Sequence, residues 1–160
     1  MTVLPSKLWK DMPPATRLTA AEAFWRDDQG DEQQAEAVVL LARRLNFRPK
    51  ALQKLPVDRR ARMLAQVAEL PDTVATRALI AYHFASQRPL MAGFLDALGV
   101  AHEDGLIAAE EMPAPDPEKL KAAVAAIRSS FPADDVERYL RTLMVLDGDT
   151  WAGVEEAAGT

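Results

Sequence analysis

The chain has 160 residues, no cysteine and a formal net charge of −5 at pH 7. This length predicts a single domain over residues 1–160, large enough to bury a core without disulfides or structural metals. The absence of cysteine excludes a disulfide framework, a thiol nucleophile and a cysteine-ligated metal site. The net negative charge argues against indiscriminate nucleic-acid binding, although it is compatible with a local basic surface.

The composition favours a helical globular protein. Hydrophobic residues make up 49% of the chain and charged residues 27%, which is too apolar for a disordered protein. Alanine and leucine are abundant, and glycine is scarce. The start of the chain lacks the pattern of a signal peptide, and no apolar run approaches membrane-spanning length. We therefore expect a cytoplasmic protein with no membrane association, and the excess of arginine over lysine favours a bacterial source.

Prolines and glycines divide the sequence into helix-sized segments. After a short turn at Lys7–Met12, helices are expected to start at or near Pro14, Asp31, Pro49, Pro56 or Asp58, Pro71, Pro89, Pro117 and Pro132, with a short final helix around Trp151 and Val154. This pattern predicts an all-α fold, a single compact domain of about seven or eight helices. We expect an irregular bundle of antiparallel helical hairpins, with a short α-solenoid as the alternative.

Two helix ends carry specific predictions. Asp31 is expected to cap the helix that follows it, with Gln34 at the capping-box spacing. Gly99 is expected to end the helix that starts at Pro89, with Val100 contacting Leu95 as in a Schellman motif.

Apolar periodicity predicts which helices are buried. The helix from Asp31 is expected to be central, because its apolar residues recur at intervals of three and four. These residues are Ala35, Val38, Val39, Ala42 and Leu45, widened by Leu40 and Leu41. The segment Thr73–Ser86 is apolar on nearly all sides, which is typical of a helix buried on several faces.

The remaining segments are expected to be irregular or short. Leu106–Glu111 is predicted to form one or two helical turns, residues 112–117 a proline-rich link, and residues 1–13 and 155–160 loosely ordered ends. No segment indicates a strand. Three tryptophans near the chain ends are expected to dock the terminal helices onto the core rather than to form a partner surface: Trp9, Trp25 and Trp151.

The strongest feature is a basic stretch over residues 43–62, which sums to +7 and contains one acid, Asp58. Its cations are Arg43, Arg44, Arg48, Lys50, Lys54, Arg59, Arg60 and Arg62. Such a surface favours an acidic protein, a phosphate or a nucleic acid as its ligand.

Part of the basic stretch has a purely structural explanation. Arg43 and Arg44 end a helix that begins with acids, which the helix dipole favours, and Asp58 and Arg62 are spaced to pair within one helix. An acidic segment, residues 103–118, carries six acids and no base and is a possible internal counterpart. Arg48, Lys50, Lys54 and Arg59 have no such explanation.

Other candidate sites are weaker. The helices around Pro49 resemble a helix-turn-helix in spacing, but the second is short and base-reading residues are sparse, Gln53 being the main one. His83 lies in an apolar helix and is expected to be a hydrogen-bonded core histidine rather than a proton-transfer group. No metal, nucleotide or nucleophile motif is complete.

These observations predict a non-enzymatic interaction or adaptor module that binds an acidic protein partner. We expect no catalytic, cofactor-binding or metal-binding residues and no cofactor. The first alternative is a nucleic-acid-binding protein that uses the same surface, and the second is a ligand carrier or enzyme with an interhelical pocket near Tyr82 and His83. The sequence predicts no oligomeric state. The predicted partner-binding residues are Arg48, Lys50, Lys54, Arg59 and Arg62.

Overall fold

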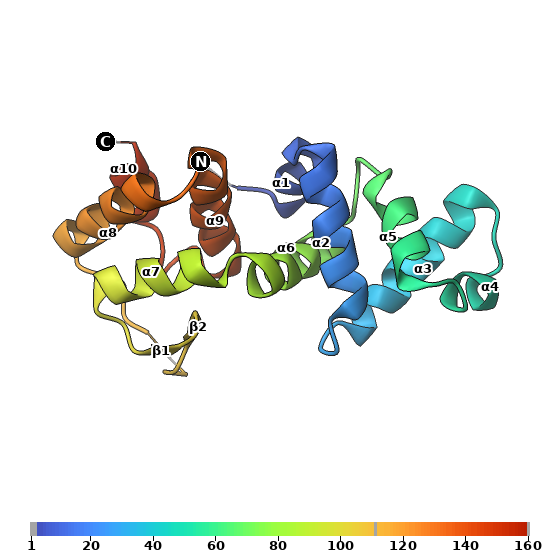
Figure 1. Cartoon of the computed structure of the whole chain (residues 1–160), viewed down its shortest axis with the longest axis horizontal. Helices are drawn as coiled ribbons and strands as arrows, with labels where there is room; N and C mark the ends of the chain where they lie inside the picture. The colour runs from blue at the N-terminus through green and yellow to red at the C-terminus, as the bar shows by residue number, and fades with distance from the viewer. Residues whose placement is uncertain (1–2, 111, 160) are drawn as a thin grey trace. The chain divides into compact units, whose positions relative to one another are not determined.

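The computed structural model describes residues 3–110 and 112–159, and in these residues the fold is all-α (Figure 1). The helices are α1 (Pro5–Asp11), α2 (Pro14–Arg26), α3 (Asp31–Leu45), α4 (Pro49–Gln53), α5 (Val57–Ala65), α6 (Asp72–Ser86), α7 (Arg88–Leu98), α8 (Pro117–Ser130), α9 (Ala133–Leu146) and α10 (Val154–Ala158). The strands are β1 (His102–Glu103) and β2 (Leu106–Ile107). Three of the helices in the described residues, α1, α4 and α10, are only five to seven residues long.

The chain divides into two compact units. The N-terminal unit comprises the described residues up to Ala85, and the C-terminal unit comprises those from Ser86 onward. The single domain expected from the sequence stays a prediction. In the part of the chain that the structure describes, no helix is both long enough and apolar enough to span a membrane.

The N-terminal unit is built on the packing of α2 against α5, with α3 lying against α4 and α5. Its largest fully buried side chains are Trp9, Phe24, Leu41, Leu52, Leu64 and Leu79. Trp9 of α1 donates its indole N–H to the carbonyl oxygen of Val67 at 2.8 Å. This buried hydrogen bond fixes α1, which lies in the segment expected to be loosely ordered, against the end of the α5 region.

A partly buried ion pair joins the end of α2 to α6. The Nε of Arg77 donates to Oδ2 of Asp27 at 2.6 Å, and the two side chains are 23% and 12% exposed. The Gln34 amide donates to the carbonyl oxygens of Phe24 and Asp27 at 2.9 and 2.7 Å. Two side chains, Gln34 of α3 and Arg77 of α6, therefore hold the turn between α2 and α3.

The start of α3 differs from the prediction. Asp31 is the first helical residue, the N-cap is Gly30, and no side chain caps the helix. Gln34 does not complete a capping box, because its amide is used to satisfy the carbonyl groups at the end of α2. Asp31 and Glu32 still lie in the first turn, where the helix dipole favours acids.

The buried face of α3 is narrower than predicted. Val38 and Ala42 are buried as expected, together with Ala37 and Leu41. Ala35 and Val39 are instead exposed, because the inward stripe is centred about one residue away from the predicted one. Leu45 continues the spacing of the stripe but is 40% exposed. The apolar stripe of α3 thus extends beyond the part of the helix that is covered.

The C-terminal unit packs α7 against α8, and α8 against α10. Phe94 lies at the centre of an aromatic cluster, with ring centroids 5.5 Å from Tyr139 and 5.8 Å from Trp151. Burial raises the pKa of the Tyr139 hydroxyl far above its ordinary value. All three tryptophans of the chain are buried, as expected of side chains that dock short helices onto a core: Trp9, Trp25 and Trp151.

The end of α7 agrees with the prediction. Gly99 has a φ of 74°, the left-handed conformation that glycine adopts without a steric cost. The Val100 N–H donates to the carbonyl oxygen of Leu95 at 3.0 Å, which is the longer bond of a Schellman motif.

The segment after α7 contradicts the prediction of helical turns in Leu106–Glu111. Leu106 and Ile107 form a strand that pairs antiparallel with His102 and Glu103. The physical reason is the turn between them, in which Asp104 and Gly105 have φ values of 51° and 94°. Two successive left-handed residues make the tight turn that suits a β-hairpin. Glu111, the last residue of the predicted turn, lies outside the described residues.

Candidate functional site

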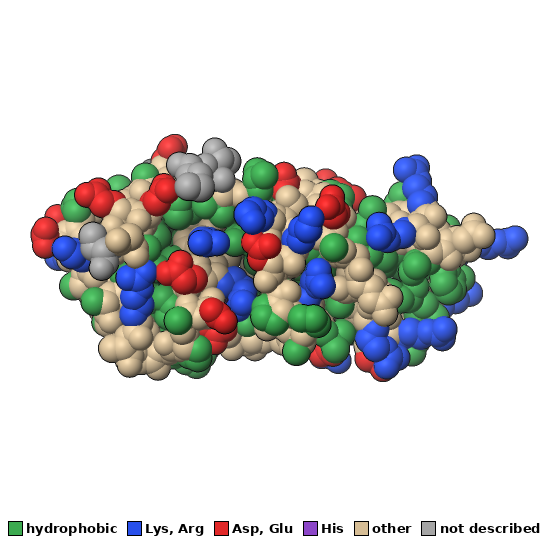
Figure 2. Space-filling view, turned by 90° about the horizontal axis from the view of Figure 1, so that it is seen from above, with side chains coloured by type: hydrophobic (Ala, Val, Ile, Leu, Met, Phe, Trp, Pro, Cys, Tyr) green, Lys and Arg blue, Asp and Glu red, His purple; other side chains and the backbone are tan. Residues whose placement is uncertain are grey.

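The basic stretch forms one end of the N-terminal unit. Figure 2 shows Lys and Arg side chains projecting around the end where α4 lies, at the right of the view. We call this surface the basic end and define it by its exposed cations: Arg43, Arg44, Arg48, Lys50, Lys54, Arg59 and Arg62. It includes every partner-binding residue predicted from the sequence.

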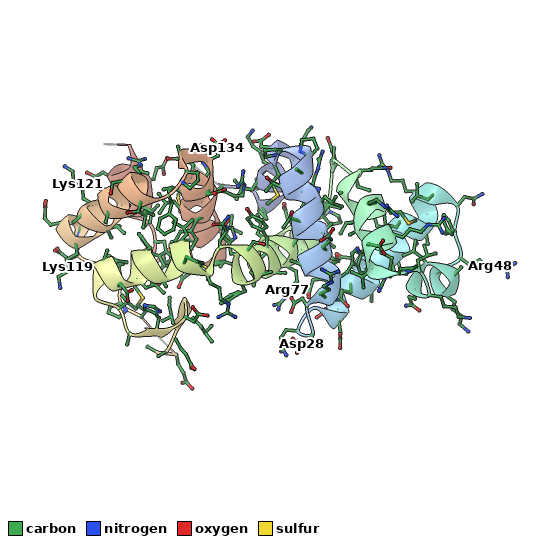
Figure 3. The ribbon with its side chains drawn as sticks, viewed as in Figure 1. Asp28, Arg48, Arg77, Lys119, Lys121 and Asp134 are labelled. Carbon is green, nitrogen blue, oxygen red and sulfur yellow. The ribbon has the colours of Figure 1, made fainter. Side chains whose placement is uncertain are left out.

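Three helices position the cations of the basic end. Arg43 and Arg44 lie in the last turn of α3, where the helix dipole favours positive charge. Arg48 is the N-cap of α4 and points away from the ribbon (Figure 3). Arg59 and Arg62 lie one turn apart on the exposed side of α5, as their spacing predicts.

The turn between α3 and α4 is fixed by the backbone. Asn46 adopts a left-handed conformation with a φ of 61°, and both its N–H and that of Phe47 donate to the carbonyl oxygen of Ala42. Leu52, which is fully buried, anchors α4. The cations around this turn therefore project from a defined backbone rather than from a loose loop.

Two apolar side chains are exposed at the same turn. Leu45 is 40% exposed and Phe47 is 38% exposed, and both lie within three residues of Arg44 and Arg48. The apolar stripe of α3 reaches Leu45, but the elements packed on α3 do not cover the helix that far. The sequence placed Leu45 in the core, so periodicity alone missed this part of the surface. The basic end thus combines positive charge with an apolar edge.

Among the residues that the structure describes, the seven cations of the basic end form no ion pair and no side-chain hydrogen bond. The predicted pair between Asp58 and Arg62 is not formed, because both side chains are exposed and a surface pair gains little over hydration. The charge of one of these cations, Arg44, acts on the carboxylate of Glu69. Its pKa lies below the ordinary value, first because of its hydrogen bond and ion pair with Lys10 and to a smaller extent because of the charge of Arg44.

Arg60 is the cation of the stretch that is used internally. Its guanidinium lies 5.0 Å from the ring centroid of Trp25, in a cation–π contact between α5 and α2. Arg60 is half-buried, whereas its neighbours Arg59 and Arg62 are exposed. The helical spacing on α5 therefore separates one structural arginine from two that are available to a ligand.

The helix-turn-helix interpretation does not fit the helix lengths. The helix that would enter the major groove, α4, has five residues. A recognition helix must present several successive turns to base edges, and α4 offers little more than one.

A pocket of about 390 Å³ lies elsewhere in the N-terminal unit, between α1 and the segment that follows α5. The polar groups at its wall are paired with each other: Lys10 with Glu69 at 3.0 Å and Lys7 with Asp11 at 3.1 Å. It lacks the convergent, unsatisfied polar groups of a ligand site. It is also distinct from the region of Tyr82 and His83, where the sequence suggested a pocket.

Both histidines are within hydrogen-bond distance of residues in their own unit. His83 is buried, with its Nδ1 2.8 Å from the carbonyl oxygen of Leu79 and its ring edge-on to Tyr82. The Nε2 of His102 lies 2.7 Å from Oδ1 of Asp96, and its Nδ1 accepts the Gly105 N–H at 3.0 Å. Within residues 3–110 and 112–159, no three His, Asp or Glu side chains converge as metal ligands.

Comparisons with known proteins identify no relative. No protein-family model matches the chain, and searches of the curated proteins and of the solved structures found no significant match.

Proposed function

We propose that this protein is a non-enzymatic interaction module that binds an acidic protein segment through its basic end, in the cytoplasm. The observation that carries the proposal is the set of exposed cations without ion-pair partners in the described structure, set beside Leu45 and Phe47. Unpaired surface cations attract a polyanion at long range, and an apolar edge adds contact that charge alone does not supply.

The apolar edge is the specific reason to favour a protein over a nucleic acid. Nucleic-acid backbones are bound mainly by neutralising phosphates, and that binding weakens steeply with salt. Acidic peptides with leucine or phenylalanine side chains can instead bury them against Leu45 and Phe47 while their carboxylates meet the cations. Such binding should weaken less steeply with salt than binding to DNA does.

The test uses three fluorescent probes: an acidic peptide with leucine and phenylalanine anchors, the same peptide with those anchors replaced by serine, and a random DNA duplex. Fluorescence anisotropy is measured with the full-length protein over a range of NaCl concentrations. We expect the anchored peptide to bind best, and Arg48→Glu/Arg62→Glu to weaken its binding about tenfold or more. No peptide binding at low salt, or tighter binding to DNA, would overturn the proposal.

A matched control changes the same amount of charge elsewhere. Lys119 and Lys121 are exposed on α8, in the C-terminal unit (Figure 3). The variant Lys119→Glu/Lys121→Glu alters the net charge of the chain by the same amount as the basic-end variant. We expect it to retain peptide binding, because the binding depends on the position of the cations and not on net charge alone. Equal loss of peptide binding in both variants would show that net charge, and not the position of the cations, controls binding.

A further inference from the structure

The charge of the molecule is divided between its two units. Thirteen Lys and Arg against ten Asp and Glu give the N-terminal unit +3, and six against fourteen give the C-terminal unit −8. The chain therefore carries both the basic end, for which we propose an acidic ligand, and a C-terminal unit whose acids have the chemistry of such a ligand.

The acidic ligand chemistry is concentrated on the β-hairpin. Glu103 and Leu106 are directly opposite each other in its register, so their side chains lie next to each other on one face. Both are exposed, and Leu106, at 55%, is the most exposed large hydrophobic side chain in the described residues. A carboxylate beside an exposed leucine is the complement of the cations, Leu45 and Phe47 at the basic end.

The hairpin is held rigidly on its own unit. The Gly105 N–H donates to His102 Nδ1, which leaves His102 Nε2 to donate to Asp96 at the end of α7. A nitrogen of the Arg88 guanidinium donates to the carbonyl oxygen of Asp104 at 3.1 Å. Because these bonds fix the turn, Glu103 and Leu106 are presented with little conformational entropy left to lose on binding.

Further acids extend the surface along the chain. Glu110, Asp116 and Glu118 are exposed, and like Glu103 they form no ion pair in the described part of the chain. Asp104 differs, because its carboxylate lies 3.5 Å from Arg88. These acids add unpaired negative charge to the segment that follows the hairpin.

We propose that the occupant of the basic end is the acidic hairpin of a second copy of this chain, so that the protein self-associates head to tail. The inference rests on the proposed function and names its partner. Since the two surfaces are different, the contact is heterologous, and it builds either a closed ring or an open chain of copies. Because the contact relies on exposed charges that salt screens, the association should be weak and salt-sensitive.

The test combines three proteins at full length: the native chain, the basic-end variant Arg48→Glu/Arg62→Glu, and the hairpin variant Glu103→Lys/Glu110→Lys. Analytical ultracentrifugation measures their mass over a range of concentrations. At low salt, the native chain should exceed 17.6 kDa increasingly as its concentration rises, and return to this mass in about 1 M NaCl, where the Debye length is about 3 Å. Each variant alone should remain a monomer.

Mixing the two variants gives the decisive result. Each one retains the surface that the other has lost, so the equimolar mixture should form a heterodimer and stop there. Circular dichroism checks that both variants fold. A native chain that is monomeric at every concentration, or a mixture that does not associate, would overturn self-association. If the native chain is monomeric but still binds the anchored acidic peptide, the proposed function stands and only the identity of the partner is wrong.

Discussion

Buried indole groups show how much a single hydrogen bond matters in this fold. Trp9 and Trp25 are both almost fully buried in the N-terminal unit. The Trp9 N–H has an acceptor, the carbonyl oxygen of Val67, whereas in the described structure the Trp25 N–H has none. The sequence predicted that both side chains are buried, but no pattern in it distinguishes the two indole nitrogens. That difference depends on which backbone atom the fold places beside each ring.

This contrast predicts different costs for the same substitution. Trp9→Phe leaves the Val67 carbonyl oxygen buried and unsatisfied, whereas Trp25→Phe removes a donor that already lacks an acceptor. We expect Trp9→Phe to be more destabilising than Trp25→Phe by about 1–2 kcal/mol. Urea denaturation of both variants measures this, and each serves as the volume control of the other. Equal losses would mean that the Trp9 hydrogen bond contributes nothing.

The Asp27–Arg77 pair makes a pH-dependent contribution to stability. Burial raises the pKa of Asp27, but the hydrogen bond from Arg77, the N–H of Gln29 and the charge of Arg77 together outweigh burial, and the pKa lies below its ordinary value. A carboxyl with a lower pKa in the folded state stabilises the protein above the unfolded pKa of about 4. This contribution is lost as the pH falls through the folded-state pKa.

Replacing Arg77 should therefore have its largest effect at neutral pH. We expect Arg77→Met to cost about 1–2 kcal/mol at pH 7, with a difference from the native chain that narrows as the pH falls below the unfolded pKa of about 4. Urea denaturation across this range gives the comparison. Arg26→Met is the control, because the Arg26–Glu22 pair is exposed and its atoms are 3.8 Å apart. A difference that is constant with pH would exclude Asp27 as its source.

At the scale of elements, α3 and α4 show where periodicity is sufficient and where it is not. The helical spacing of α3 correctly indicated an inward stripe containing Val38 and Ala42. It could not show that the cover ends before Leu45, because the length of the stripe belongs to α3 and its cover belongs to neighbouring elements. The exposed apolar edge of the candidate site arises from this mismatch. The hairpin was missed for a related reason, since two-residue strands are too short to show alternation.

Two leucine substitutions distinguish the residue that anchors α4 from a residue that is exposed at the basic end. Leu52 is fully buried and Leu45 is 40% exposed. Leu52→Ala should lower the free energy of unfolding by about 2–4 kcal/mol, because it leaves a cavity beneath α4. Leu45→Ala should cost less than about 1 kcal/mol yet weaken binding of the anchored peptide. Thermal denaturation and anisotropy measure the two effects, and a reversed order would contradict the assigned roles.

At the scale of the whole molecule, the division into two units bears on how cooperatively the chain unfolds. The chain divides into two compact units, but only Gln87 separates α6 from α7. We expect the chain to unfold in one transition, with equal calorimetric and van't Hoff enthalpies, as the single domain predicted from the sequence requires. Differential scanning calorimetry at low protein concentration and high salt avoids any contribution from self-association. Two resolved transitions would show that the units unfold separately.

The sequence by itself determined the helical class, the division into helices at prolines, the Gly99 helix end and the position of the cations along the chain. These follow from local backbone preferences and from charge, which nearby residues set. Only the tertiary structure decided that Arg60 stacks on Trp25 while Arg59 and Arg62 are exposed, and that Leu45 and Phe47 form an apolar edge. Those outcomes depend on which elements cover a side chain, and that is determined by packing between segments far apart in sequence.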